Sequence, residues 1–422
     1  MDHDSTLSRR TPAASASDRV LQEANGRHTG NTSLRRHDGY EAFSYLEPHA
    51  DHPVFALAPD VGRLPAYDCG LSFDQEERAR GLLGEHIVIS LHDHPFRLPA
   101  EMSQLGAYQR SGRVALGYEG LSHSQLDAVF DNVGGPGWSW DATVTDLGMR
   151  LGDVAHQDFV VHARTAAEIR RAHATGRLAL VIGLEGAELI GEDLDRIDVL
   201  YGLGVRQLGI AYQERNALGY GLQAPVDHGL TAFGRLAVQR MNRLGMAIDL
   251  SHAGDRTAMD VIEASENPVL ITHAGARAVW NTRRMKPDEV IRACAARGGL
   301  IGLEAAPHTT LSAAHPRHDI ESVLDHLRYC VELVGMDHVA FGPDTFFGDH
   351  VALHGALAET LDMAAFHAAG PAFEPTEYVR GLENPGECFP NIVRCLVREG
   401  WDDASIAAVV GGNVMRVLDG IW

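Results

Sequence analysis

LALVIGLE, residues 178–185, is the stretch that decides the fold of this chain. Seven residues without a charged or hydrogen-bonding side chain run directly into Glu185. Such a run is typical of a strand buried on both faces, as in a parallel sheet that is covered by helices. Similar apolar runs recur along the chain at 86–91, 206–211, 246–250, 268–272, 299–303 and 338–341.

Amphipathic stretches with the period of a helix separate these apolar runs. They lie at 165–175, 231–244, 255–264, 287–297 and 320–334. Strands that alternate with helices indicate an α/β protein with a parallel sheet. About eight such units are expected from residue 85 onward, which predicts a (β/α)₈ TIM barrel with its site at the C-terminal mouth.

The remaining segments differ from the barrel in composition. Residues 1–35 are polar and low in aromatics, and we expect a disordered tail there. Residues 36–84 are expected to form an N-terminal elaboration of the barrel, which spans 85–422. An irregular excursion is expected at about 345–390, where Gly, Pro, Ala and His are frequent.

Charge and cysteine usage exclude several classes of protein. The formal net charge is −21 and no Lys/Arg-rich run is present, so nucleic-acid binding is not expected. The five cysteines are widely spaced and form no CxxC pair, which argues against a disulfide framework or a cysteine zinc site. A reducing, cytoplasmic location is the simplest expectation. No run of 18 apolar residues occurs, so no membrane partner is expected. The expected partner is a small-molecule substrate. Whether the chain forms a homodimer is left open by the sequence.

Lys286 is the single lysine of the chain. A carboxylated lysine that bridges two metals, or a lysine that forms a Schiff base, therefore has only one available position. Lys286 directly precedes Pro287, and we expect it in a polar loop.

Polar side chains of the kinds that bind metals follow one apolar run after another. The C-terminal ends of barrel strands converge on one mouth, so residues far apart in sequence meet there. A single histidine after a strand is more often an ordinary hydrogen-bonding residue. Several at successive strand ends are hard to explain by packing, because charged groups are rarely buried without partners or a metal. The residues are His92, His94, Glu185, His252, His273 and Asp344.

His92 and His94 stand two residues apart, which places both side chains on one face of an extended strand. Asp93 between them would point to the other face, unless the strand ends at His92 ahead of Pro95. Neutral imidazole is a good ligand for zinc and related divalent ions. We therefore expect His94 rather than Asp93 to be the metal ligand.

The other ligand-type residues predict a second metal ion beside the first. Glu185 can give one carboxylate oxygen to each of two metals, and His252 and His273 would complete the second site. Two divalent ions, with zinc expected, would polarise a scissile carbonyl and activate a bridging water. Asp344 would then be the proton shuttle, and the less favoured alternative is that it caps a helix or accepts hydrogen bonds from residues around the site. Asp249 is expected to support the site rather than to bind metal.

Several motifs resemble the membrane (renal) dipeptidase family, peptidase family M19, which consists of amidohydrolase-like metal-dependent hydrolases. The resemblance covers roughly residues 85–422. It implies the two-zinc roles given above for His92, Glu185, His252 and His273, and it implies that Arg284 binds the terminal carboxylate of the substrate. A guanidinium fork matches a carboxylate. The motifs are MNRLGMAIDLSH at 241–252, PVLITHAGARAV at 268–279, GVRQL at 204–208, YVRGLENP at 378–385 and GGNVMRVL at 411–418.

The chain departs from the family pattern at two positions. His94 stands where the family has an aspartate, which makes the metal site one charge more positive. Tyr212 stands where a histidine usually stabilises the oxyanion, and a tyrosine can donate a hydrogen bond there but brings no positive charge. The loop 212–221 otherwise fits the family, which implies that Asn216 contacts the substrate.

Three functions are compatible with these residues. The leading hypothesis is a zinc-dependent hydrolase of a dipeptide or related small amide bearing a free carboxylate. The alternative is a non-peptide reaction on the same scaffold, such as hydrolysis of an N-acyl amino acid or a lactam, or a decarboxylation, which the departures at His94 and Tyr212 favour. A catalytically inactive binding protein fits poorly, because the ligand-type positions and Asp344 are intact.

Overall fold

The computed structural model describes residues 37–47, 52–135, 138–357 and 372–422. The predicted tail at 1–35 lies outside the described residues. The strands are β1 Ile89–Arg97, β2 Ala128–Asn132, β3 Val160–His162, β4 Leu178–Leu184, β5 Val205–Gly209, β6 Ala247–Asp249, β7 Leu270–Ala274, β8 Leu300–Leu303, β9 Val339–Phe341 and β10 Phe346–Phe347.

Helices follow most of these strands along the chain. They are α2 Phe73–Glu85, α3 Leu105–Arg110, α4 Tyr118–His123, α5 Trp140–Val154, α6 Ala166–Ala174, α7 Asp195–Gly202, α8 Ala232–Leu244, α9 Asp255–Ala264, α10 Asp288–Ala296, α11 Ile320–Val334, α12 His350–Leu357, α14 Cys388–Arg398, α15 Asp403–Ala407 and α16 Asn413–Ile421.

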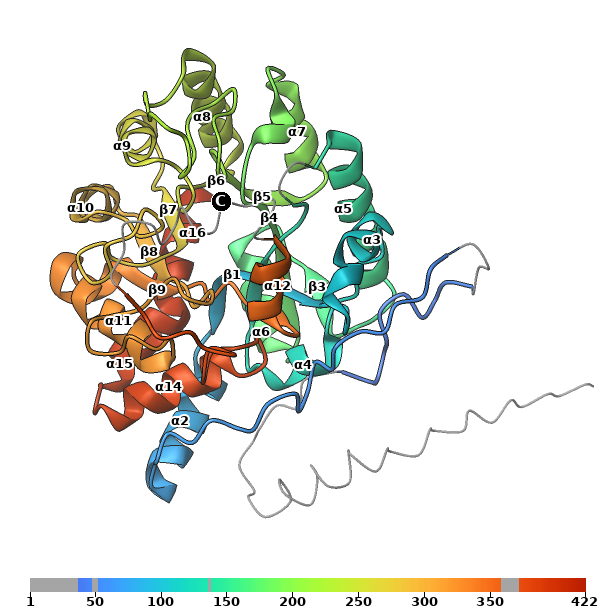
Figure 1. Cartoon of the computed structure of the whole chain (residues 1–422), viewed down its shortest axis with the longest axis vertical. Helices are drawn as coiled ribbons and strands as arrows, with labels where there is room; N and C mark the ends of the chain where they lie inside the picture. The colour runs from blue at the N-terminus through green and yellow to red at the C-terminus, as the bar shows by residue number, and fades with distance from the viewer. Residues whose placement is uncertain (1–36, 48–51, 136–137, 358–371) are drawn as a thin grey trace, which may run out of the picture. The chain divides into compact units, whose positions relative to one another are not determined.

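The strands pair in parallel in the order β10-β1-β2-β4-β5-β6-β7-β8-β9. β9 and β10 belong to one continuous stretch of chain, and this stretch returns to β1. The Asp344 N–H donates to His92 O at 3.0 Å, and the His94 N–H donates to Thr345 O at 2.9 Å. The sheet therefore closes on itself, as the (β/α)₈ prediction requires. Figure 1 shows α5 and α7–α11 outside these strands.

The predicted helices begin and end close to their expected residues, because local capping side chains are present. The hydroxyl of Thr165 accepts from the Glu168 N–H at the start of α6, and that of Thr231 accepts from the Gly234 N–H at the start of α8. Such caps satisfy amide groups that have no partner within the first turn of a helix. The boundaries of these helices could therefore be predicted from residues next to them in sequence.

The strand predictions differ from the structure in two respects. The first strand does not stop at His94 but continues through Pro95 to Arg97, with an irregular register against β10 between His94 and Arg97. A proline has no N–H to give to the ladder, which accounts for a local irregularity. The strands β2, β3 and β10 were missed, and β10 lies within the stretch expected to be an irregular excursion. β3 pairs with Leu178–Leu180, at the start of β4.

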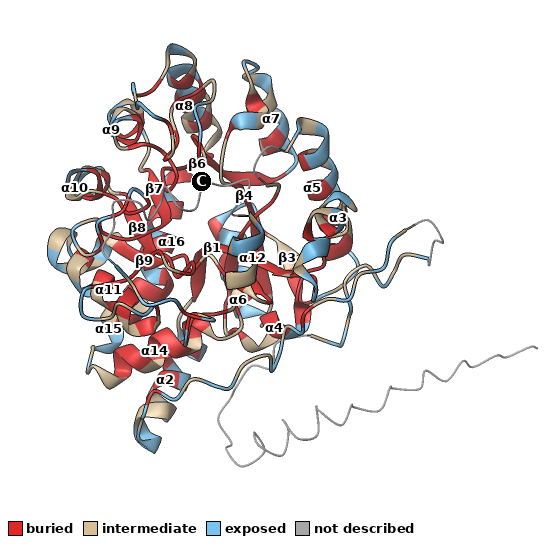
Figure 2. Cartoon of the chain, in the orientation of Figure 1, coloured by how far each residue is buried: buried red, intermediate tan, exposed pale blue. Residues whose placement is uncertain are grey.

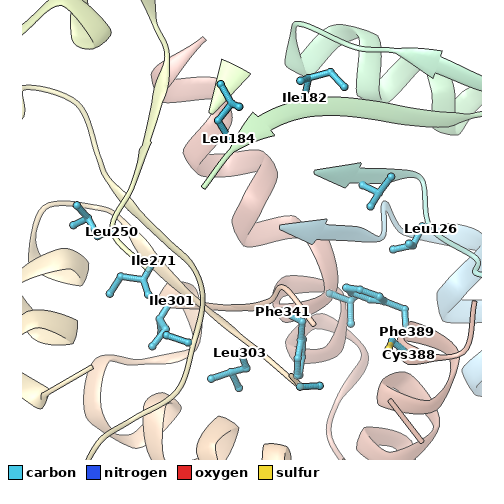
Figure 3. Packing of buried hydrophobic residues seen from close by; sticks show 14 of the residues in the cluster. Leu126, Ile182, Leu184, Leu250, Ile271, Ile301, Leu303, Phe341, Cys388 and Phe389 are labelled. Carbon is cyan, nitrogen blue, oxygen red and sulfur yellow. The ribbon is translucent and has the colours of Figure 1, made fainter. Parts of the chain in front are cut away.

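The core fills the space between the strands and the outer helices. Figure 2 shows buried residues along the strands and on the inner faces of the helices. Figure 3 shows Phe341 of β9 beside Phe389 of α14, and their ring centroids lie 6.3 Å apart. Burial of such aromatic side chains supplies much of the hydrophobic stabilisation of a fold.

The described part of residues 36–84 packs against the C-terminal half of the chain. Arg394 of α14 forms an ion pair with Glu76 of α2. The Sγ atoms of Cys69 and Cys395 are 3.6 Å apart, and all five cysteines are free thiols, as the sequence predicted. The division of the chain at residue 84 stays a prediction.

The segment Asp403–Ile421 joins α15, a π-helical turn at Ala408–Gly412 and α16. By length and composition alone it could cross a membrane, with a mean hydropathy of 1.3, but 56% of its apolar window is buried inside the fold. Val414, Val417 and Leu418 pack in the core. Packing therefore accounts for the apolar residues of this segment, and the absence of a membrane partner stays a prediction.

Candidate active site

The predicted ligand-type side chains meet at the C-terminal ends of the strands. His92 and His94 lie on β1, and Glu185 directly follows β4. His252 lies three residues past the end of β6, and His273 is on β7. Asp344 lies between β9 and β10 with a φ of 59°, a left-handed conformation that aspartate adopts more readily than most residues. These side chains are buried or nearly so, with Glu185 20% and Asp344 16% exposed.

One half of the cluster surrounds the two histidines of β1. Their Nε2 atoms are 3.3 Å apart. Asp344 Oδ1 lies 3.2 Å from His92 Nε2 and 3.3 Å from His94 Nε2. These three residues can hold one metal ion between them, since their ligand atoms lie within 4.8 Å of one another.

Glu185 connects this half to the other. Its Oε1 lies 3.1 Å from His94 Nε2, whereas its Oε2 lies 3.3 Å from His252 Nε2. His252 Nε2 is in turn 2.9 Å from His273 Nε2. The two oxygens of one carboxylate thus face two different histidine groups, which is the arrangement that a bridging ligand needs.

Asp93 points away from the cluster. Its carboxylate accepts from Ser90 Oγ at 2.5 Å, and from the N–H and Oγ1 of Thr345 at 2.8 and 2.7 Å. Because β1 stays extended past Pro95, Asp93 occupies the opposite face of the strand from His92 and His94. Asp93 therefore joins β1 to the stretch that follows β9.

Two side chains orient the imidazole rings. The amide of Asn132, at the end of β2, contacts His92 Nδ1 at 2.8 Å, and Thr272 Oγ1 contacts His273 Nδ1 at 2.9 Å. Contacts of this kind turn Nε2 toward a metal and fix the ring. Asn132 was missed in the sequence because β2 was missed: the apolar run there is only three residues long, 128–130, and is followed first by Asp131.

The charges of the cluster suit a bound cation. Burial alone would raise the pKa of the Glu185 carboxyl, but hydrogen bonds to His252 and His94 hold that pKa well below its usual range. Burial would lower the pKa of His94, yet its bonds to Asp344 and Glu185 raise it to about 10. The two carboxylates therefore stay ionised and stabilise positive charge at this point.

The histidines of the other half are neutral. Burial lowers the pKa of His252 to about 4 and holds that of His273 well below its usual range. The two Nε2 atoms lie 2.9 Å apart, where one neutral ring can donate to the other; with both protons on Nδ1, their lone pairs would instead face each other without a partner. A divalent ion that accepts nitrogen and oxygen ligands would supply that partner, so the donor set fits the predicted metal site.

Glu304 is a site residue that the sequence analysis missed. It directly follows β8, is fully buried, and forms an ion pair with Arg284. Its carboxylate also lies within 4.8 Å of the ligand atoms of His273 and Asp344. Burial raises the pKa of Glu304 to about 7. A carboxylate directly after the apolar run at 299–303 is the same signal that identified Glu185.

Arg284 is buried, and its guanidinium is already engaged. In addition to its ion pair with Glu304, the guanidinium donates hydrogen bonds to His273 O at 2.9 Å and to Ser251 O at 3.3 Å. The structure thus brings Arg284 next to the cluster, and its role in binding a substrate carboxylate stays a prediction.

Lys286 lies in a loop, as expected, but this part of the loop is not exposed. It is fully buried, and its Nζ donates to Ala253 O at 2.6 Å. Burial lowers its pKa to about 7. The residues around position 286 are polar, but the bridge between Ala276 and Lys286 draws this stretch inward.

Tyr212 and Asn216 lie differently with respect to the cluster. The ring of Tyr212 packs on that of His252, with centroids 4.2 Å apart, and burial raises the pKa of its hydroxyl well above the usual value. Asn216 instead holds its own loop: its amide donates to Ile210 O at 2.8 Å and accepts from the Leu218 and Gly219 N–H groups. The structure does not place Asn216 against the histidine cluster, and its substrate contact stays a prediction.

Comparisons with known proteins agree on one family. The family model of the membrane dipeptidases (peptidase family M19) matches residues 143–357, which excludes His92 and His94. Dipeptidase tcpJ of Claviceps purpurea is 28% identical over 65% of this chain and 58% of its own length. Dipeptidase verJ of Clonostachys rogersoniana is 30% identical over 61% of this chain and 59% of its own length. The chain thus spans somewhat over half the length of these relatives.

A solved amidohydrolase from Pseudomonas aeruginosa has a similar fold over most of this chain. It superposes with a TM-score of 0.66 at 25% identity, over 82% of this chain and 99% of that one. Since the family model covers half of the chain, and the barrel and the cluster at its mouth agree with it, this protein belongs to the membrane dipeptidase family, peptidase family M19.

Proposed function

We propose that this protein is a metal-dependent hydrolase of dipeptides or related small amides that bear a free carboxylate. The observation that carries the proposal is the placement of Glu185, whose two oxygens face His94 and His252 from the centre of the cluster. The membership of this chain in the dipeptidase family also supports hydrolysis of a dipeptide or a related amide.

Two divalent ions, with zinc expected, would be held by the residues of the cluster. His92 and His94 would bind the first ion, His252 and His273 the second, and Glu185 both. When bound, such a pair of ions polarises a carbonyl and lowers the pKa of a shared water. A nitrogen-rich ligand set favours zinc over magnesium or calcium, which prefer oxygen ligands.

The other groups would act on the substrate. Asp344 would take a proton from the attacking water at Oδ1 and pass it to the leaving amine. The hydroxyl of Tyr212 stays protonated because its pKa is raised, so it can donate a hydrogen bond to the developing oxyanion. Arg284 would bind the terminal carboxylate of the substrate.

Metal content and hydrolysis together test this proposal. We expect about two zinc ions per chain after reconstitution, because the cluster offers two ligand groups joined by one carboxylate. The zinc-loaded protein should release free amino acids from a panel of dipeptides. Glu185→Gln should lower the occupancy of both ions, whereas Glu332→Gln, at an exposed position of α11, should lower neither. Full metal occupancy in Glu185→Gln would contradict the bridging role.

The departures at His94 and Tyr212 support a second candidate, which is hydrolysis of an N-acyl amino acid or a lactam. The same panel should include one compound of each class. Turnover of these compounds with no turnover of any dipeptide would favour this candidate over dipeptide hydrolysis. A cytoplasmic location stays a prediction.

A further inference from the structure

The ion pair between Arg284 and Glu304 lies at the edge of the cluster, and the proposed function does not use Glu304. Both side chains are buried: Arg284 is 5% exposed and Glu304 is fully buried. Glu304 Oε2 contacts the guanidinium, and its Oε1 accepts a long hydrogen bond of 3.5 Å from Thr310 Oγ1. Glu304 thus binds the guanidinium of Arg284 in the way that a substrate carboxylate would.

The charge of this pair determines which substrates it favours. Arg284 alone would present one positive charge to the substrate, but with Glu304 the pair is neutral. A substrate carboxylate that approaches Arg284 also approaches Glu304 and Asp344, which lie close to each other beside His273. Like charges in a site of low exposure repel strongly, because water screens them little. A neutral amide or ester end does not meet this repulsion.

Glu304 could instead act as a further metal ligand, since its carboxylate lies near His273 and Asp344. Its contact with Arg284 argues against this role, because the guanidinium competes with a cation for the same oxygen. The two roles make different predictions for metal content, which the experiment below measures.

We propose that Glu304 is a specificity-determining residue: an internal carboxylate on Arg284 that a substrate carboxylate must displace. Because Glu304 competes for the guanidinium, Arg284 binds a free carboxylate of the substrate less tightly than an unpaired arginine would. This inference rests on the proposed metal-dependent hydrolysis and concerns only the substrate group that faces Arg284. A repulsive element against one class of ligand is a common way to achieve specificity.

The experiment compares two substrates that differ only in this charge, alanyl-alanine and its C-terminal amide, with the zinc-loaded full chain. In Glu304→Gln, which keeps the shape of the side chain, KM for alanyl-alanine should fall about tenfold or more. We expect kcat to change little, and the KM of the amide to change far less than that of alanyl-alanine. Zinc content should also stay unchanged.

Two controls make the result specific. Arg284→Met combined with Glu304→Gln removes both charges, and should abolish the gain for alanyl-alanine. Arg284→Ala alone is unsuitable, since it leaves Glu304 as an unpaired buried carboxylate. Glu383→Gln removes another fully buried carboxylate that is paired with an arginine, Arg63, outside the cluster, and should leave the ratio of kcat/KM for the two substrates unchanged.

Several outcomes would overturn the inference. An unchanged or higher KM for alanyl-alanine in Glu304→Gln would remove the competing role, and a loss of zinc would make Glu304 a metal ligand. If Glu304→Gln does not fold, Glu304→Ala decides by the same measurement, and an unchanged or higher KM for alanyl-alanine in that variant contradicts the inference. Failure to hydrolyse either substrate would instead contradict the proposed function.

Discussion

At the scale of single residues, the identity of the ligand on β1 depends on which face of the strand each side chain occupies. The carboxylate of Asp93 is held by Ser90 and Thr345, whereas His94 Nε2 faces Glu185 and Asp344. We therefore expect His94→Ala to lose metal from the site that it shares with His92. His94→Asp should keep two ions, because aspartate can serve as a ligand at this position.

The matched variant is Asp93→Asn, measured for zinc content by elemental analysis. It should keep both ions, although it weakens the hydrogen bonds that join β1 to Thr345. Loss of a hydrogen bond to a charged group costs about 1.5–3 kcal/mol of unfolding free energy. Zinc lost from Asp93→Asn and kept in His94→Ala would show that Asp93 is the ligand.

Tyr212 provides a second test at this scale. Its ring packs on His252, and its raised pKa keeps the hydroxyl protonated. Tyr212→Phe keeps the packing and removes the hydrogen-bond donor. If the hydroxyl stabilises the oxyanion, kcat should fall about 100-fold or more while the zinc content stays constant. A kcat within about twofold of the wild type would exclude this role.

At the scale of elements, the position of Glu185 depends on a close approach between β4 and β5. A Cβ added to Gly209, the last residue of β5, would lie 1.8 Å from Glu185 O and 2.4 Å from Glu185 C. Both contacts are with backbone, which cannot turn aside as a flexible side chain can. Gly209 therefore lets the backbone that carries Glu185 lie against β5.

Gly209→Ala should displace Glu185 and so weaken metal binding about tenfold or more, since shifts around ligands have effects of this size. We also expect about 1–3 kcal/mol less unfolding free energy from overpacking. The control is Gly148→Ala in the middle of α5, where an added Cβ meets nothing within 4 Å. That variant should gain about 0.5–1 kcal/mol from helix propensity. Equal metal affinity in both variants would contradict the argument.

At the scale of the whole molecule, bound metal should stabilise the fold. The cluster joins β1, β4, β6 and β7, so an ion bound there links strands from the first and second halves of the chain. Ligands that bind only the folded state raise its stability, by about 4 kcal/mol at a thousandfold excess over Kd. Chelation should therefore lower Tm by several degrees and leave the far-ultraviolet circular dichroism unchanged.

Re-addition of zinc should restore Tm, whereas magnesium should not, because it prefers oxygen ligands. The measurement is a thermal melt before and after chelation, repeated with Glu185→Gln. That variant should show little response to zinc. A Tm that responds to neither chelation nor zinc would contradict the proposed metal centre.

The sequence by itself determined the alternation of strands and helices from β4 onward and most of the ligand-type cluster, but it did not reveal β2, β3 or β10. Hydrophobic periodicity and caps such as Thr165 and Thr231 act over a few neighbouring residues, so they are visible in the chain. In a parallel barrel every strand ends at the same mouth, so His92, Glu185 and His273 could be placed together without a structure.

Only the tertiary structure decided which side chains meet across strands and how deeply each is buried. Asn132 against His92 and Glu304 on Arg284 are contacts between residues 40 and 20 positions apart, from strand ends and loops that must first be brought together. Lys286 was expected in a polar loop, and only the structure shows that its side chain is fully buried. Burial and ion pairing depend on every element that surrounds a side chain. A local sequence pattern does not specify which elements these are.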